Sequence, residues 1–250
     1  MDPEPSATAT GAFADVSLDD LTTGEPIKQI MALHKLLYEQ CNGKECSHYF
    51  DVLHKHCLVI GPNFNKEVRL LTYSAIKQMN INADQWSRLV PYILGDVNGT
   101  DVEVKCAAIK MFKHMPTPLI IELVNSGVDF LGFGRSSPKS PTPTPAEVDQ
   151  HMQIRCAALN TLTVLLLYRD GLQGLKGFSL SGWSLMADRI LYDPSRKVFK
   201  VALEAVSTLI AILHRNSRHR MNDASIPTLN RTTGLSSVPH SSGVHTPVTP

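Results

Sequence analysis

The sequence carries little net charge, no long hydrophobic run and no leader-like N-terminus. Its 24 Lys and Arg residues against 23 Asp and Glu residues leave a formal charge of +1, so the bulk electrostatics demand neither nucleic acid nor an anionic membrane. The longest apolar run, residues 162–168, is far shorter than the roughly 20 residues that cross a bilayer. The first residues are acidic and lack the basic and apolar regions of a signal peptide. We therefore expect a soluble cytoplasmic protein unless something else recruits it.

The cysteines do not form the dense framework of a small secreted domain, because there are five of them and they are spread through apolar segments. The best candidate metal site combines Cys41 and Cys46 with His54, His56 and Cys57. Structural zinc usually takes close cysteine pairs on a turn, whereas Cys41 and Cys57 fall on predicted apolar helix faces. A buried free cysteine behaves as a small hydrophobe. The pattern favours core cysteines over zinc, and we expect no metal or cofactor.

Catalytic motifs are missing as well. There is no nucleophile elbow, no phosphate-binding loop ending in Gly-Lys-Ser/Thr and no His pair on one helical turn. Gly171, Gly174 and Gly177 are evenly spaced, but they follow a predicted helix instead of a strand, which favours a linker over a nucleotide site. The ten histidines are scattered, without an obvious Asp or nucleophile partner. We expect a protein that is not an enzyme and has no small-molecule substrate.

Polar stretches divide the chain. Residues 1–25 are rich in Ala, Thr, Asp and Pro, and residues 215–250 are rich in Ser, Thr, Pro and Asn, which is typical of disordered segments. Between them, residues 132–149 contain proline at nearly alternate positions as far as residue 145. Proline removes amide donors and disfavours helix, so this stretch is predicted to be a loop insertion. The folded region is therefore expected at residues 26–214.

Within that region apolar residues recur at helical spacing, and the alternation typical of strands is almost absent, so the predicted fold class is all-α. Short polar breaks at residues 61–62, 96–101 and 192–195 contain Gly, Pro, Asp or Asn, which turn the chain and cap the next helix. The predicted helices span residues 27–40, 45–60, 66–79, 83–94, 101–114, 118–124, 146–168, 182–191 and 195–214.

Four of these helices share one sequence pattern, which begins at Val68, Val104, Ile154 and Val198, about 36, 50 and 44 residues apart. In each, a β-branched residue is followed five and eight places later by apolar residues on the same helical face. Without the Pro-rich loop the second spacing approaches the first, within the range of HEAT-type helix pairs. The pattern predicts an α-solenoid of HEAT/armadillo-like repeats, because stacking buries the apolar stripe that one pair leaves open.

Two of the four segments carry Ala-Ala in the middle. Ala108 and Ala158 occupy matching places in their repeats. A small side chain lets a neighbouring helix approach closely, so both alanines are expected to face such a helix.

Several segments together resemble the N-terminal trunk of adaptin and coatomer subunits: residues 68–76 (VRLLTYSAI), 82–86 (NADQW), 101–109 (DVEVKCAAI) and 114–116 (HMP). Trp86, Trp183 and residues 197–206 are most similar to the TPLATE family of plant-type endocytic adaptor subunits. The resemblance covers roughly residues 27 to 221, whereas the Pro-rich insertion and the polar N-terminus do not look like family trunk.

This resemblance implies a scaffold subunit of a TPLATE-type complex in clathrin-mediated endocytosis and cell-plate formation. The implied partners are the other adaptor-complex subunits and the clathrin machinery, with no nucleic acid. The implied location is peripheral at the plasma membrane, at clathrin-coated pits and at the cell plate. The alternative is an unrelated HEAT or armadillo scaffold of the nuclear transport receptor or phosphatase scaffold type.

Two surface features have functional and plain structural interpretations. A basic cluster at the end of the last predicted helix is a candidate membrane or partner contact, but the helix dipole also favours cations there. It consists of Arg215, Arg218, His219 and Arg220. Ser and Thr residues directly before proline in the polar stretches are candidate phosphorylation sites. The alternative is that these stretches are unregulated spacers. The candidate sites are Ser137, Ser140, Thr142, Thr144, Thr246 and Thr249.

Overall fold

The structure is a computed structural model, which describes residue 13 and residues 15–61, 63–138, 141–168 and 178–223. The chain divides into two compact units, Met1–Ile212 and Leu213–Pro250. The first unit holds the helical repeats, and the described part of the second is the end of one helix. Regular secondary structure in the described residues is helical throughout, which confirms the predicted all-α class.

The helices follow the predicted order closely. The chain begins with a 3-10 turn, η1 (Leu18–Thr22), and the second predicted helix is a composite of η2 (Ser47–Tyr49), α2 (Phe50–Val52) and a π-helical turn, η3 (Leu53–Cys57). The other helices are α1 (Pro26–Cys41), α3 (Lys66–Ile76), α4 (Ala83–Asn98), α5 (Val102–Met111), α6 (Thr117–Asn125), α7 (Phe130–Gly134), α8 (Pro145–Tyr168), α10 (Phe178–Tyr192) and α11 (Arg196–Asp223).

Side-chain caps explain where several helices begin. Asn82 forms a capping box with Gln85: each side chain accepts from the other residue's backbone N–H at 2.9 Å. The Asp101 carboxylate accepts from the backbone N–H groups of Glu103 and Val104, in the first turn of α5, at 3.0 Å. Such bonds satisfy amides that have no partner inside the helix. These caps fix the helix starts locally, before any packing is considered.

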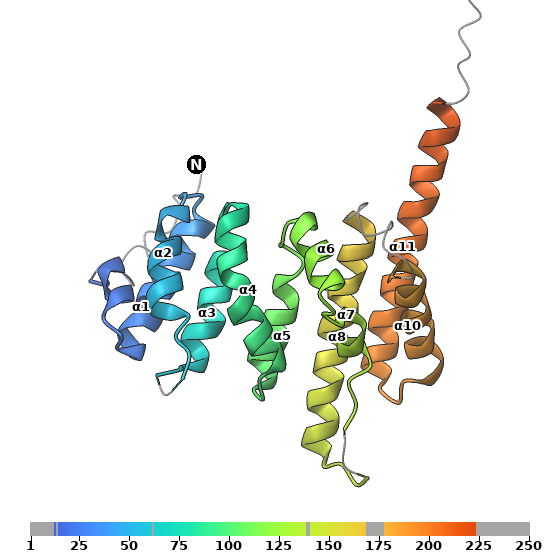
Figure 1. The fold of residues 1–250 in the computed structure, drawn as a ribbon, viewed down its shortest axis with the longest axis horizontal. Coiled ribbons are helices and arrows are strands. Elements are labelled where there is room, and N and C mark those ends of the chain that lie inside the picture. Colours follow the sequence, from blue (N-terminus) through green and yellow to red (C-terminus); the bar gives the residue numbers. More distant parts are fainter. Residues whose placement is uncertain (1–12, 14, 62, 139–140, 169–177, 224–250) are drawn as a thin grey trace, which may run out of the picture. The chain divides into compact units, whose positions relative to one another are not determined.

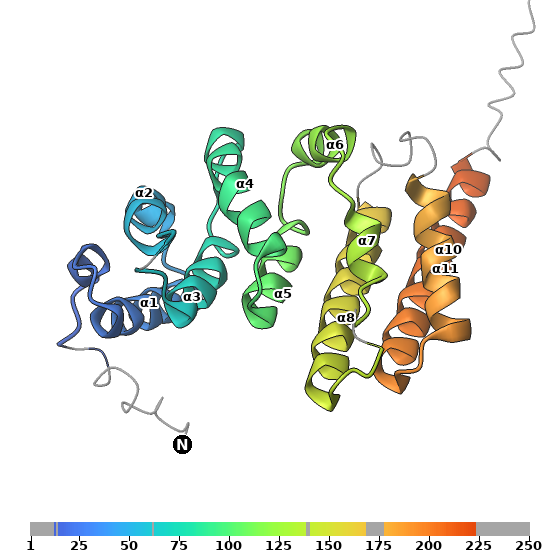
Figure 2. The same cartoon turned by 60° about the horizontal axis from the view of Figure 1, so that its bottom comes forward.

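The helices that carry the shared pattern form the row predicted for a solenoid. Helix α1 packs against α3, α3 against α5, and α5 against α8, while α4 packs on α5 and the short α7 on α8 (Figures 1 and 2). Helix α10 contacts both α7 and α8. Buried side chains of all these helices belong to one continuous apolar cluster. The chain is an all-α helical-repeat solenoid.

Burial follows the shared pattern in three of its four copies. The β-branched residues that begin it are buried in every copy: Val68, Val104, Ile154 and Val198. The apolar residues five places later are buried in the first three copies: Tyr73, Ile109 and Leu159. The fourth, Leu203 on α11, is 45% exposed. Helix α11 is thus covered on one side only within the described residues.

The N-terminal segment is more ordered than its composition predicted. Val16 and Leu21 are buried in the core, and Gln29 on α1 donates from Nε2 to the Leu21 carbonyl at 3.0 Å. These buried side chains and the hydrogen bond hold the segment against α1. Residues 1–12 and 14, the rest of the predicted disordered segment, lie outside the described residues.

Other boundaries shift because apolar contacts extend the helices. Helix α4 continues through the predicted break to Asn98, with Val97 buried. The loop predicted over residues 132–149 is shorter, because α7 ends at Gly134 and α8 begins at Pro145. Proline is favourable at the first turn of a helix. Helix α11 reaches Asp223, so residues 215–223 are helical, and residues 224–250 lie outside the described part.

Candidate interaction surface

The residues that the sequence analysis weighed as candidate metal ligands do not come together. Cys46 and Cys57 are buried as predicted, but Cys41, the last residue of α1, is exposed. Burial raises the pKa of the Cys57 thiol to about 12, so it stays protonated and uncharged at neutral pH. The His54 ring instead packs against the rings of Phe50 and Tyr92, with centroids 5.9 and 5.3 Å away. In the described part of the chain, no group of three His, Cys, Asp or Glu side chains could hold a metal ion.

The other candidates from the sequence have different positions. Gly171, Gly174 and Gly177 lie outside the described residues. The cluster at residues 215–220 lies within α11, before the helix ends at Asp223, so it belongs to the last turns of a helix that is longer than predicted. Among the described helices, none is long and apolar enough to pass through a bilayer.

One candidate phosphorylation site has a structural role. Ser137, Thr142 and Thr144 are exposed, whereas Ser140, Thr246 and Thr249 lie outside the described residues. The Thr144 hydroxyl accepts from the Glu147 backbone N–H at 3.2 Å, and the Glu147 carboxylate accepts from the Thr144 backbone N–H at 2.7 Å. This capping box begins α8. A phosphate on Thr144 would place a second negative group beside the Glu147 carboxylate.

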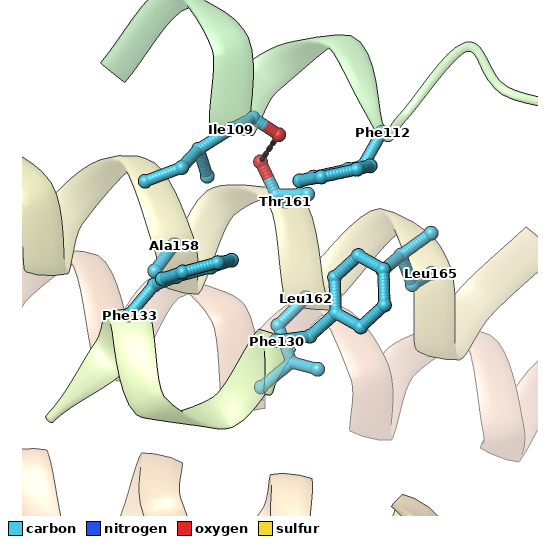
Figure 3. A pocket seen from close by; sticks show the side chains of 8 residues that line it. All are labelled: Ile109, Phe112, Phe130, Phe133, Ala158, Thr161, Leu162 and Leu165. Atoms are coloured by element: carbon cyan, nitrogen blue, oxygen red, sulfur yellow. Dashed lines mark hydrogen bonds between the residues drawn. The ribbon is translucent and has the colours of Figure 1, made fainter. Parts of the chain in front are cut away.

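The contact between α5 and α8 shows how neighbouring repeats stack (Figure 3). Ile109 of α5 and Phe112, the residue directly after this helix, face Ala158, Leu162 and Leu165 of α8. Two phenylalanines of α7, Phe130 and Phe133, line the same contact. The Thr161 hydroxyl donates to the Ile109 carbonyl at 3.3 Å. The remaining space is about 10 Å³, which barely admits one water molecule. This region is a packed helix interface, and no ligand of larger size fits it.

Both alanines are buried, as predicted. Ala108 is fully buried and Ala158 is 5% exposed, and Ala158 lies in the α5–α8 contact beside Leu162. A methyl group at this position leaves room for the side chains of the facing helix. The inward face that the pattern predicted for these helices is confirmed.

Two buried arginines were not found from the sequence. Arg69 on α3 is 2% exposed, and its Nε lies 3.2 Å from the Asp96 carboxylate of α4. Its Nη2 donates to the Val59 carbonyl at 3.0 Å, and the Tyr73 hydroxyl donates to Asp96 at 2.6 Å. Burial raises the pKa of Asp96 despite these partners, and burial raises the pKa of Tyr73 as well. The arginine therefore ties a loop and the end of the next helix to α3.

Arg155 makes the same connection on α8. Its Nη1 donates to the Ser136 carbonyl at 2.8 Å, and its Nε lies 2.8 Å from the fully buried Asp193 carboxylate. The same carboxylate accepts from the Ser195 backbone N–H at 2.9 Å and forms an ion pair with Arg189 at 3.2 Å. Arg69 and Arg155 both stand second in the shared pattern, directly after the β-branched residue. An arginine at the same place in two copies of the pattern is the sequence feature from which these buried arginines could have been predicted.

Helix α11 carries a group of exposed apolar side chains. Phe199, Leu203 and Ile210 are 38%, 45% and 56% exposed, and Val206 is partly buried between them. Their spacing of three and four residues places them on one face of the helix. A second face is buried in the core through Val198, Ala202, Ala205 and Leu209. We call the first set, Phe199, Leu203, Val206 and Ile210, the open face of α11.

This row of helices is similar in sequence to TSET complex member tstA of Dictyostelium discoideum. The two are 31% identical over 203 residues, which is 80% of this chain and 13% of tstA. By its name, tstA is a member of a complex, TSET. This chain therefore corresponds to a small part of the length of its relative. No family model matches the chain, and no solved structure matches it.

Proposed function

We propose that this chain is a non-enzymatic scaffold subunit of a TPLATE/TSET-type adaptor complex. The observation that carries the proposal is the 31% identity to tstA, which extends over 80% of the chain, and thus over most of the helical row. The adaptin-trunk and TPLATE resemblance of residues 27 to 221 points to the same class of complex. Similarity of that extent goes beyond a few leucines and alanines shared by unrelated helical repeats.

The physical role of such a subunit is to hold other chains at fixed positions. Stacked repeats supply a long surface, and each repeat contacts only its neighbours. The buried ion pair of Arg69 with Asp96 joins α3 to α4. The buried ion pair of Arg155 with Asp193 joins α8 to the turn that follows α10. Binding then uses exposed side chains, and the open face of α11 is one apolar group among them. No bond is made or broken in this function.

The proposal extends to the place of action. Following the TPLATE resemblance, we propose peripheral association with the plasma membrane, clathrin-coated pits and the cell plate, with clathrin machinery among the partners. The cluster of Arg215, Arg218, His219 and Arg220 is the proposed contact for anionic headgroups, each basic residue contributing about 1 kcal/mol near such a surface. Fluorescence imaging of the tagged chain tests the location, and charge reversal at Arg215 and Arg218 should reduce its membrane fraction.

Affinity purification tests the assembly. The tagged chain is purified from cells that express it, and the co-purifying proteins are quantified by mass spectrometry. Stoichiometric recovery of TSET- or TPLATE-type subunits supports the proposal. Recovery of importin cargo or phosphatase subunits instead would favour the unrelated scaffold, and a chain recovered alone would contradict an obligate subunit role.

A further inference from the structure

Thr144 combines a kinase recognition signal with a structural contact. It is exposed and directly precedes Pro145, the first residue of α8. Proline-directed kinases modify Ser and Thr residues in this position. The Thr144 hydroxyl also donates to the Glu147 carboxylate at 3.1 Å, within the capping box of α8. Ser137 and Thr142 precede proline as well, but neither belongs to this capping box.

We infer that Thr144 is phosphorylated by a proline-directed kinase and that the phosphate opens the capping box at the start of α8. The kinase transfers the γ-phosphoryl group of ATP to the Thr144 hydroxyl oxygen. A P–O bond forms at that oxygen as the bond to the ADP leaving group breaks, and the hydroxyl proton passes to the general base of the kinase. The modified side chain has lost the hydrogen atom that it donates to Glu147.

The start of α8 is accessible to a kinase because it lies outside the core. Residues 145, 146 and 148–150 are exposed and Glu147 is half-buried, and the first buried residue of the helix is Ile154. Unwinding this end therefore loses backbone hydrogen bonds but little apolar contact, and such segments open locally at low cost in free energy. A kinase can bind Thr144 in an extended conformation without disturbing the core.

The charges around Thr144 decide that the phosphate opens the capping box. A helix N-terminus attracts an anion with a partial charge of roughly +0.5. Against this attraction, the Glu147 carboxylate carries a full negative charge 3.1 Å from the oxygen that bears the phosphate. The phosphate adds nearly two negative charges at this point, so the carboxylate turns away. The Thr144 backbone N–H, which donates to that carboxylate at 2.7 Å, then loses its partner.

The cleft beside this turn adds further negative charge. Ala146 and other residues at the start of α8 line a polar cleft of about 370 Å³ together with the first residues of α5. Among the described residues of that lining, Lys66 is the one basic residue, and the acidic residues are Asp101, Glu103 and Asp149. Lys66 already lies 3.3 Å from Asp101 and 3.0 Å from Glu103. The phosphate therefore lies close to a mostly acidic surface at the boundary between two repeats.

Mass spectrometry of the tryptic peptide 140–155 tests the site. The peptide is prepared from the purified chain after incubation with ATP and a proline-directed kinase, and from the chain isolated from cells that express it. We expect phosphate on Thr144 in both samples. A Thr144 that carries no phosphate in either sample, whether or not Ser137 or Thr142 is modified, would overturn the assignment.

NMR titration of the Glu147 carboxyl group tests the opening of the capping box. In the unmodified chain, its hydrogen bonds with the Thr144 backbone N–H and hydroxyl hold the pKa of Glu147 below its ordinary value. With phosphate on Thr144 these bonds are lost and a like charge lies nearby, so the pKa of Glu147 should rise above that value. The matched control is the chain phosphorylated on Thr142 alone, in which the pKa of Glu147 should stay low. A low pKa in the Thr144-phosphorylated chain, or an equal rise in the control, would overturn the inference.

Hydrogen exchange at the Thr144 amide tests the electrostatic cause. Phosphorylation of Thr144 should speed this exchange about threefold or more, because the amide loses its bond to Glu147. Glu147→Gln keeps an acceptor oxygen without the charge, so in this variant phosphorylation should change the exchange rate less than about twofold. Equal acceleration in both chains would refute repulsion as the cause. All three measurements use the chain by itself, so their outcome is independent of the proposed adaptor function.

Discussion

The Asp193→Asn substitution tests the buried charge cluster of the α8 repeat. The Asp193 side chain is fully buried and lies against two arginines, Arg155 at 2.8 Å and Arg189 at 3.2 Å. Asparagine keeps one acceptor oxygen but places an NH2 donor where the second carboxylate oxygen lay. Arg155, which is 5% exposed, then has a donor opposite its own N–H groups and no neutralising charge.

The expected loss is large because one partner of a buried ion pair is removed. Such a change costs about 3–5 kcal/mol. For a chain of this size, about 2–4 °C of melting temperature is lost per kcal/mol, so the shift should be about 6–20 °C. Repeats contact only their neighbours, so the destabilisation should be strongest in α8 and α10.

Urea unfolding and amide hydrogen exchange measure these two effects. The matched control is Glu204→Gln, which breaks the exposed Lys200–Glu204 pair at 3.8 Å and should cost less than about 0.5 kcal/mol. Arg155→Met should cost less in the Asp193→Asn background than in the wild-type chain, because Arg155 has already lost its carboxylate partner there. A loss of less than 1 kcal/mol for Asp193→Asn, or full additivity in the double variant, would refute this account.

Other predictions follow from burial and titration. Ala108→Leu should lower the free energy of unfolding by about 1–3 kcal/mol, because it overpacks a fully buried site. Ala211→Leu, at an exposed site on α11, should be nearly neutral. Equal melting temperatures of the two variants would show that the inward face is wrong. Iodoacetamide on the native protein should label Cys41 first, and rapid labelling of any of the four buried cysteines, followed by mass spectrometry, would contradict their burial. Burial, together with nearby Arg and Lys charges, lowers the pKa of His151 in the folded state below the ordinary 6.5. The unfolded chain then takes up the proton first, so this residue's contribution to stability should be lost as pH falls below 6.5, and His151→Gln should flatten that part of the pH profile in unfolding measurements.

The zinc hypothesis shows where sequence spacing reaches its limit. Cys41 and Cys57 both lie on helices, but one is exposed at a helix end and the other is buried. Spacing along the chain fixes neither the direction of the Cys41 side chain at the end of α1 nor its distance from His54. The packing of the helices decides that His54 lies against the rings of Phe50 and Tyr92 instead of beside other candidate metal ligands.

The polar stretches were predicted from composition, and composition was a poor guide to their edges. Residues 215–223 are helical and Val16 and Leu21 are buried, although both segments are polar overall. A helix extends as long as its backbone bonds continue, and a short segment is held by a few buried contacts. Average composition predicts neither effect, because helix extension depends on the residues that precede the segment and burial depends on the residues that pack beside it.

The sequence by itself determined the helices and their repeat register. A period of 3.6 residues, caps such as Asn82 and breaks at Gly and Pro are local properties, so the helix class and the shared face could be predicted without coordinates. Tertiary structure decided which faces are covered and which charges meet. Arg155 and Asp193 are 38 residues apart in sequence, and Leu203 and Ile109 have equivalent places with opposite exposure. Both facts depend on which helix packs beside a given face, and that is set by the stacking of whole repeats.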